Sequence, residues 1–337
     1  MSRPSEPLGA GMPTNRPALS AARIATQVIG FAIGAALLGW CIVKAIGSAD
    51  LDRLRQADLR LVATMIVVSA LSMLCAGTAF WLALRPARRI PWGVHQAVNA
   101  MATLVNYAPV RLGVPSRFVY HMGVDGLGAW LVAGWVATVG ACTLSALAGM
   151  TFGALVGVGA IELLGLGVAI SIIAGLGCAA ATTEVCVRLV GLVRHVPLVA
   201  RKLGGAESML ASRASLRLVA ATRFVDFSLC AARAWCAGRI LDLPLDTQQI
   251  LLVALAGYIV NYNPLGRFGF REATMAFVAS RLAGETGLDV GAAFAQLALV
   301  ESAGEALASI PLGTVGGSWC GLRILRARRA QRAPRAA

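Results

Sequence analysis

Residues 24–43 read IATQVIGFAIGAALLGWCIV, a largely apolar run that begins after Arg23 and ends before Lys44. Its length of about 20 residues is what a helix needs to cross the hydrocarbon core of a bilayer. The run is longer than the core of a signal peptide, and no small-x-small cleavage site follows it. It therefore predicts a first membrane span that stays in the protein.

The composition of the whole chain points to the same class of protein. Of the 337 residues, 58% are hydrophobic and 14% are charged, and the mean hydropathy is +0.73. A soluble domain usually has about 25% charged residues. The composition therefore argues against a soluble enzyme, and it excludes a disordered chain, collagen and a secreted disulfide scaffold. We expect an all-α fold, a polytopic integral membrane helical bundle.

The basic residues are numerous and are almost all arginines. The net charge is +14, and among the 30 Lys and Arg residues only Lys44 and Lys202 are lysines. In a soluble protein such a charge would suggest a nucleic-acid partner. In a chain this apolar, positive charges are expected to mark the cytoplasmic side of the membrane, so we expect no nucleic acid.

Five further spans follow the first one. They are expected at 61–84, 127–150, 160–187, 216–240 and 290–318. The positive charges that flank the six full spans favour cytoplasmic N- and C-termini, although Arg53, Arg55 and Arg60 after the first span do not fit this orientation. The predicted organisation is a loose cytoplasmic tail at 1–23, a transmembrane domain at 24–320 and a basic cytoplasmic tail at 321–337.

Two other apolar stretches, 95–122 and 247–284, are interrupted near their centres by Pro, Gly and Arg. Each stretch is either a re-entrant hairpin of two half-helices or a pair of short, tilted crossings. Irregular backbone at membrane depth is tolerated only where protein or a watery cavity covers it. A third ambiguous segment, 188–215, is either a basic amphipathic helix on the inner leaflet or a cytoplasmic loop.

The two interruptions share a sequence pattern. Residues 105–109 read VNYAP and residues 260–264 read VNYNP, and an R-x-G triplet follows each of them at Arg111 and Arg267. The corresponding Asn106 and Asn261 are separated by three predicted spans, an odd number, so the two copies would have opposite orientations. Inverted repeats with broken helices indicate the substrate site of a transporter. We therefore expect two broken-helix hairpins in a pseudo-symmetric inverted repeat.

The chemistry of such a break suits an anionic ligand. Proline ends a half-helix and glycine allows the turn, and the next half-helix then offers free backbone N–H groups and a positive dipole end. Ser116 is a plausible cap for one such start. Guanidinium groups bind phosphate in a two-pronged geometry. The arginines at the two breaks are Arg111, Arg117, Arg267 and Arg271. The alternative is that these side chains extend to water at the interface.

Other charges lie within predicted spans. Arg223, Asp226 and Arg233 share one side of the span at 216–240, so we expect them to face the bundle interior together. Glu301 and Glu305 are one helical turn apart in the last span. They either form an ion-pair clamp with Arg233, Arg267 or Arg271, or carry a proton for coupled transport. Glu272 is expected to join the same network.

No convincing catalytic centre, cofactor site or metal site emerges from the sequence. The eight cysteines form no C-x-x-C pair and lie mostly in apolar runs, so we interpret them as packing residues. Ser116, Arg117, His121 and Asp125 resemble part of a membrane lipid phosphatase signature, but the spacing is wrong and the companion segments are missing. Nucleotide-binding loops and a G-x-S-x-G motif are also missing. We expect a protein that is not an enzyme.

Residues 269–273, GFREA, resemble the flippase-like transmembrane domain of lysylphosphatidylglycerol synthases. The second motif of that family, roughly P-x-x-x-G-x-G-x-R-E-A, is matched by Pro264, Gly269, Arg271 and Glu272. The first motif is matched by Asn106, Pro109, Gly113 and Arg117. Two positions depart from the family pattern, because Val114 replaces an acidic residue and Glu301 stands where relatives often carry an arginine.

The resemblance covers most of residues 24–320. It implies a free-standing member without the aminoacyl-transferase domain, located in a prokaryotic inner membrane as a multi-pass protein that moves lipids between leaflets. The implied partner is an anionic phospholipid or a polyprenyl-phosphate-linked molecule, and a homodimer or an association with a lipid-modifying enzyme is compatible with it. The residues expected to bind the substrate are Arg267, Arg271, Glu272, Arg111, Arg117, Asn106 and Asn261. The alternative function is a non-catalytic scaffold for a lipid- or glycan-synthesising enzyme.

Overall fold

The computed structural model describes residues 21–46, 56–108, 112–164, 167–193, 206–263, 267, 269–284 and 291–332. Every regular element in these ranges is a helix, and they contain no strand. The predicted all-α class is confirmed.

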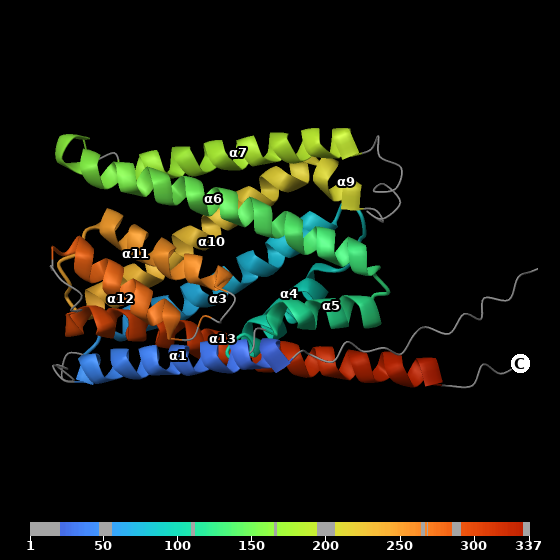
Figure 1. The fold of residues 1–337 in the computed structure, drawn as a ribbon, viewed down its shortest axis with the longest axis horizontal. Coiled ribbons are helices and arrows are strands. Elements are labelled where there is room, and N and C mark those ends of the chain that lie inside the picture. Colours follow the sequence, from blue (N-terminus) through green and yellow to red (C-terminus); the bar gives the residue numbers. More distant parts are fainter. Residues whose placement is uncertain are drawn as a thin grey trace, which may run out of the picture.

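Six long helices form the frame of the bundle. They are α1 (Ala21–Ile46), α3 (Leu59–Leu84), α6 (Ala129–Leu164), α7 (Gly167–Val193), α10 (Arg213–Ile240) and α13 (Ala292–Arg332). Figure 1 shows α6 and α7 along one edge of the molecule and α1 and α13 along the opposite edge, with α3 and α10 running obliquely between them. Each long helix corresponds to one of the predicted spans.

Three segments of these helices are long and apolar enough to cross a membrane. They are Val28–Ile46, Leu59–Leu84 and Ala129–Leu155. Helices α10 and α13 exceed 20 residues, the length of a crossing, but each contains several charged side chains. The structure therefore agrees with a membrane protein of several apolar helices, whereas the number of six crossings stays a prediction.

Each of the two interrupted stretches contains a helix, a break and a second helix. The first comprises α4 (Trp92–Val105) and α5 (Gly113–Gly123), and the second comprises α11 (Thr247–Ile259), the 3-10 turn η1 (Val260–Tyr262) and α12 (Phe270–Leu282). At about 1.5 Å per residue these four helices are roughly 16–21 Å long, shorter than a hydrocarbon core of about 30 Å. Pro109, Arg111 and Pro264 lie outside the described residues.

The prediction that Ser116 caps α5 is wrong. The residue at the N-cap is Leu112, and the helix begins at Gly113. The Ser116 hydroxyl lies inside the first turn and donates a hydrogen bond to the Gly113 carbonyl, at 2.8 Å. The helix begins earlier because the Asn106 side chain accepts a hydrogen bond from the Gly113 N–H, at 2.9 Å. Pro115 fits the first turn because no helical N–H bond is required there.

The segment 188–215 is described only at its two ends, so its two alternatives stay predictions. Residues up to Val193 continue α7, a short helix α9 spans Ala206–Ala211, and α10 begins at Arg213. Residues 194–205 lie outside the described ranges. The α7 helix ends later than expected because its sequence stays helix-compatible, without Pro, as far as Val193.

Close helix packing depends on small residues. Between α4 and α13, a Cβ added at Gly316 would lie 2.6 Å from the Ala97 carbonyl oxygen. Between α6 and α7, a Cβ at Gly149 would lie 2.7 Å from the Ala174 carbonyl oxygen. Small residues that let two helix backbones approach each other are typical of helix pairs in membranes.

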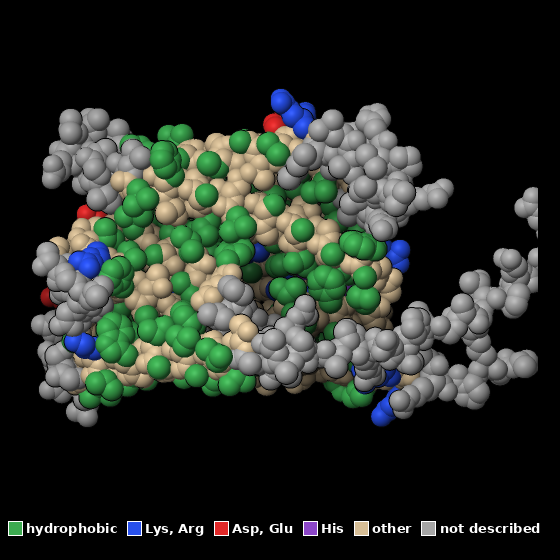
Figure 2. All heavy atoms as spheres, in the orientation of Figure 1, with side chains coloured by type: hydrophobic (Ala, Val, Ile, Leu, Met, Phe, Trp, Pro, Cys, Tyr) green, Lys and Arg blue, Asp and Glu red, His purple; other side chains and the backbone are tan. Residues whose placement is uncertain are grey.

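The exterior is rich in apolar side chains. Val43 and Val315 are each 71% exposed and Phe152 is 67% exposed. Figure 2 shows such side chains over the middle of the molecule, with Lys and Arg mostly toward its two ends. An exposed apolar surface of this extent is what a bilayer or a protein partner would cover.

Gly269 allows α12 to begin against α1. Its φ is +77°, and a Cβ at this position would lie 1.7 Å from the Gly34 carbonyl oxygen of α1. We therefore expect Gly269→Ala to separate α1 from α12 in addition to the cost of a left-handed backbone, about 1–2 kcal/mol. Thermal unfolding of the purified protein in detergent measures the change.

Gly284→Ala is the matched control for this prediction. Gly284 follows the same helix with a φ of +86°, and a Cβ there would meet no atom within 4 Å. It isolates the backbone cost, so its unfolding midpoint should fall clearly less than that of Gly269→Ala. Equal midpoints for the two variants would show that α1 and α12 are not in close contact.

Candidate anion-binding site

The largest concentration of buried charge surrounds a cavity of about 300 Å³ in the centre of the bundle. Helices α3, α4, α5, α10, α11, α12 and α13 and the two breaks contribute to it. Its polar and charged lining residues are Ser69, Ser72, Asn99, Thr103, Asn106, Arg117, Arg223, Asp226, Arg233, Tyr258, Asn261, Tyr262, Arg267, Arg271 and Glu305. Figure 2 shows a hollow in the face along the helices, with basic side chains inside it.

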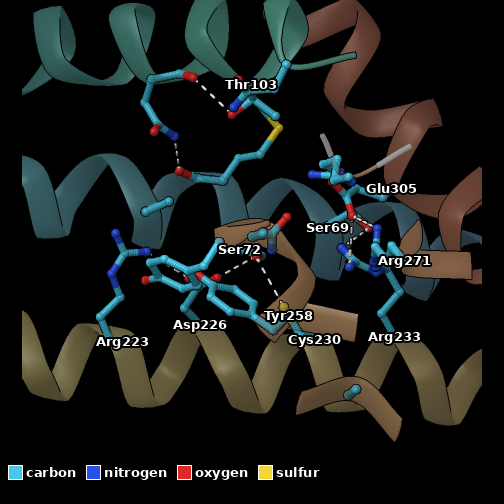
Figure 3. A pocket seen from close by; sticks show the side chains of 18 of the residues that line it. Ser69, Ser72, Thr103, Arg223, Asp226, Cys230, Arg233, Tyr258, Arg271 and Glu305 are labelled. Atoms are coloured by element: carbon cyan, nitrogen blue, oxygen red, sulfur yellow. Dashed lines mark hydrogen bonds and ion pairs between the residues drawn. The ribbon is translucent and has the colours of Figure 1, made fainter. Parts of the chain in front are cut away.

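Helix α10 places its charged residues on one side. Arg223, Asp226, Cys230 and Arg233 recur at three- and four-residue intervals, which puts them on one helix face. Arg223, Asp226 and Arg233 are 4%, 2% and 3% exposed. This face is turned toward α3, so the charges expected to point inward do so (Figure 3).

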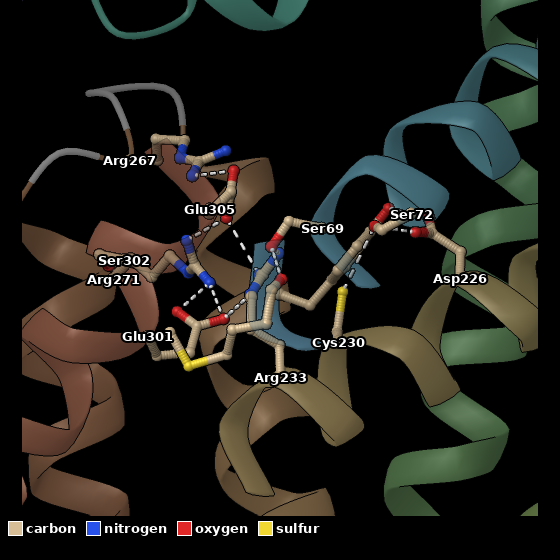
Figure 4. Close-up of polar contacts among 12 residues, drawn as sticks. Ser69, Ser72, Asp226, Cys230, Arg233, Arg267, Arg271, Glu301, Ser302 and Glu305 are labelled. Carbon is tan, nitrogen blue, oxygen red and sulfur yellow. Dashed lines mark hydrogen bonds and ion pairs between the residues drawn. The ribbon is translucent and has the colours of Figure 1, made fainter. Parts of the chain in front are cut away.

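At one end of the cavity, Glu301 and Glu305 of α13 bind three arginines. Glu301 accepts hydrogen bonds from Arg233 Nε, at 2.5 Å, and from Arg271 Nη2. Glu305 accepts from Arg233 Nη2 at 3.0 Å, Arg271 Nη1 at 2.5 Å and Arg267 Nη2 at 2.5 Å. Figure 4 shows how these side chains converge from α10, α12, α13 and the break before α12. We call these five residues the clamp.

The geometry of the clamp favours one of the two roles left open for its glutamates. Each carboxylate contacts at least two guanidinium groups, and all five side chains are at most 16% exposed. Buried charges are stable only when they are paired and hydrogen-bonded. All of these contacts are accounted for if the two glutamates form an ion-pair clamp that joins α10, α12 and α13.

At the other end of the cavity, Asp226 is the centre of a second cluster. Its carboxylate accepts hydrogen bonds from Arg223 Nη1 at 3.0 Å and from the Ser72 hydroxyl at 2.5 Å. The Tyr258 hydroxyl donates to it at 3.5 Å. The Nε of Arg223 is buried without a hydrogen-bond partner among the described residues. Arg223 therefore retains one hydrogen-bond donor for another acceptor.

Arg117 of α5 lies beside this cluster and differs from the other buried arginines. It is 7% exposed, and its Nη2 donates to Asn99 Oδ1 at 2.5 Å. Its guanidinium carbon lies 4.0 Å from the centre of the Phe80 ring, and that of Arg223 lies 5.8 Å from the same ring. In the described part of the chain, no carboxylate oxygen lies within 4.0 Å of Arg117.

The described charges around the cavity do not balance. Five arginines line it, and the carboxylates of the clamp together with Asp226 number three, which leaves two positive charges. One positive charge remains even if the nearby Glu272 is counted. The excess is local, because Asp226 pairs with Arg223 and no carboxylate among the described residues pairs with Arg117.

Glu272 interacts with the arginine network through its charge, which acts on the neighbouring Arg271, whereas its hydrogen bonds go to other groups. Glu272 is 6% exposed, and its Oε2 accepts from the Gly269 N–H at 2.8 Å, which caps the start of α12. Its Oε1 accepts from the Ser302 hydroxyl at 2.6 Å. The first turn of a helix favours a carboxylate near its free N–H groups, and this local partner is closer than the arginines.

The other residues predicted to bind substrate have different positions. Asn106 lines the cavity and holds the break between α4 and α5 through its bond to Gly113. Asn261 lines the cavity from η1. Arg267 reaches Glu305, and its guanidinium carbon lies 5.3 Å from the Tyr107 ring of the other break. Arg111 lies outside the described residues.

Sequence reasoning missed several cavity residues. Asn99 is 2% exposed; it accepts from Arg117 and donates to the Met73 carbonyl at 2.8 Å. An asparagine within an apolar helix was a signal that could have identified it. Phe80 and Ser72 have no such signal in the sequence.

The segment that resembles a lipid phosphatase signature is divided by the fold. Arg117 lines the cavity, whereas His121 Nδ1 pairs with Asp125 at 2.7 Å. The His121 ring packs against Trp135, with ring centres 4.9 Å apart. Among the described residues, no group of three or more His, Cys, Asp or Glu side chains could hold a metal ion.

Glu305→Gln should strongly destabilise the protein, because it leaves the buried Arg233 and Arg271 and the half-buried Arg267 with one carboxylate fewer. Breaking a buried pair from one side costs about 3–5 kcal/mol. Glu184→Gln is the matched control: it is the same chemical change in the exposed Glu184–Arg213 pair, 3.0 Å apart, where about 1 kcal/mol or less is expected. Thermal unfolding midpoints compare the two variants, and similar midpoints would contradict the clamp.

Comparison of the chain with protein-family models, curated proteins and solved structures gives no match.

Proposed function

We propose that the protein is a membrane transporter that moves an anionic, phosphate-bearing lipid between the leaflets of a bilayer. The observation that carries this proposal is the buried Arg117, which has no carboxylate partner among the described residues and lies next to Arg223, whose Nε is unsatisfied. A buried, uncompensated charge is costly. A phosphate group in the cavity would supply the missing negative charge.

Guanidinium groups suit this task better than ammonium groups do. Their planar donors match two phosphate oxygens at once, and they also stack on aromatic rings. Arg117 and Arg223 have this arrangement beside Phe80. The cavity volume of about 300 Å³ is at the lower end of the range for small-molecule sites, which agrees with a head group rather than a whole lipid.

The arrangement in the membrane is part of the proposal. Six crossing helices, two re-entrant hairpins at α4–α5 and α11–α12, an inverted repeat and cytoplasmic termini would place the cavity near the middle of the bilayer. The short lengths of the four half-helices and the apolar exterior support this arrangement. The resemblance to the flippase-like domain of lysylphosphatidylglycerol synthases supports the lipid substrate and a prokaryotic inner membrane.

The clamp suggests how a head group would pass. Arg267 lies in the break before α12, pairs with Glu305 and lies over the Tyr107 ring of the other break. A phosphate that enters beside Arg117 and Arg223 can next replace Glu305 as the partner of Arg267. Such an exchange of ion pairs would move the phosphate along the cavity while it always faces a guanidinium group.

Leaflet exchange in proteoliposomes tests the proposal. The purified chain is reconstituted with fluorescent phosphatidylglycerol, and a membrane-impermeant quencher reports the outer leaflet. Arg117→Gln should slow exchange by about tenfold or more, because each hydrogen bond to a charged group contributes about 1.5–3 kcal/mol. Its unfolding midpoint should not fall as that of Glu305→Gln does, because no carboxylate loses its partner.

Arg213→Gln is the control, since Arg213 is exposed and remote from the cavity. It should leave exchange unchanged. The wild-type protein should not accelerate the exchange of a neutral fluorescent glycolipid between the leaflets. Unaltered leaflet distributions with the wild-type protein would refute transport and favour the scaffold alternative, and formation of a new lipid product would instead favour an enzyme.

A further inference from the structure

A second recess, of about 420 Å³, lies on the lateral surface between α3, α4 and α13. We call it the lateral groove. Its walls are apolar or small, and they include Leu74 of α3, Gly93 of α4, and Leu312, Val315 and Trp319 of α13. Leu74, Leu312 and Val315 are 40%, 41% and 71% exposed, so the groove opens toward the surroundings of the bundle.

The lateral groove adjoins the charged cavity. Met73 and Asn99 line both recesses. The Asn99 amide donates to the Met73 carbonyl at 2.8 Å, and its oxygen accepts from Arg117. One layer of side chains therefore separates the apolar groove from the arginine that lacks a carboxylate partner.

The groove is preformed by close backbone packing. Gly313 and Gly316 bring α13 against α4 so closely that a Cβ at Gly313 would lie 3.0 Å from the Ala100 carbonyl oxygen. The polar end of Gln96 is turned to α3, where its Nε2 donates to the Leu74 carbonyl at 3.2 Å and to Thr78 at 3.1 Å. The groove thus keeps an apolar lining although Gln96 lies in its wall.

We propose that the lateral groove holds a hydrocarbon chain of the same lipid whose phosphate binds beside Arg117 and Arg223. The inference deepens the proposed function and rests on it. A phosphate-bearing lipid joins an anionic group to an apolar chain, and the molecule offers the matching pair of recesses at a single junction. Asn99 positions Arg117 at that junction and separates the polar end of the lipid from its chain.

Photolabelling in detergent tests this inference without a transport assay. The probe is phosphatidic acid with a diazirine in one acyl chain, and the comparison probe is the matching diacylglycerol, which lacks the phosphate. The full chain is labelled in a maltoside detergent, so that no other phosphate is present, and labelled peptides are identified by mass spectrometry. We expect the phosphate probe to label α4 and α13 at the groove about tenfold more than diacylglycerol does.

Gly93→Phe should fill the groove and reduce this labelling at least fivefold. The substitution can begin without a clash, because a Cβ at Gly93 would have no atom within 4 Å. Gly177→Phe on α7 is the matched control, since Gly177 has the same open surroundings and α7 lies at the opposite edge of the bundle (Figure 1). Val315→Trp fills the groove from α13 and provides a second test if Gly93→Phe does not fold.

The outcomes separate this inference from the proposed function. Equal labelling by the two probes would mean that the groove takes any surrounding lipid, and it would overturn the inference even if transport is observed. Labelling that is insensitive to Gly93→Phe and Val315→Trp would also overturn it. If labelling depends on the phosphate and Arg117→Gln abolishes it, the inference is supported. This holds even if the protein moves no lipid, and in that case only the transport proposal fails.

Discussion

The structure depends on two glutamates of α13 that bind three arginines inside an apolar bundle. Glu301 and Glu305 contact Arg233 of α10, Arg271 of α12 and Arg267 of the break between the half-helices. An isolated charge in this environment would be costly. The pairing therefore determines where α10, α12 and α13 stand relative to one another, and it holds the second broken segment in the middle of the bundle.

The arginines at the two ends of the cavity differ in how completely their charges are paired. Where Glu301 and Glu305 are present, the guanidinium groups are paired and hydrogen-bonded. At the other end of the cavity, Asp226 pairs with Arg223, whose Nε has no partner, and no carboxylate among the described residues pairs with Arg117. The same cavity thus combines a structural cluster with a site that retains a positive charge. A fold that needed only helix–helix stabilisation would not need Arg117 at this position, and this is the reason for our proposal of an anionic ligand.

Much of the architecture was predictable, since it follows from local patterns. Apolar runs of sufficient length predicted the six long helices, and the repeated VNYxP pattern located the two breaks. The inward face of α10 followed from the helical period alone. The start of α5 was predicted wrongly, and the hydrogen-bond partners of Glu272 were not foreseen. The Gly113 N–H donates to the Asn106 side chain and the Gly269 N–H donates to Glu272, and neither bond has a periodic signal in the sequence.

The sequence by itself determined the class of the protein, the inward-facing charges and the positions of the breaks, because these depend on apolar length, helical period and Pro or Gly content. Only the tertiary structure decided which charges meet. Arg233 and Glu301 are 68 residues apart and Arg267 and Glu305 are 38 apart, so their pairing depends on how helices pack. The same packing decides that Arg117 has Asn99 and Phe80 as its neighbours, and that the cavity adjoins an apolar groove at Asn99.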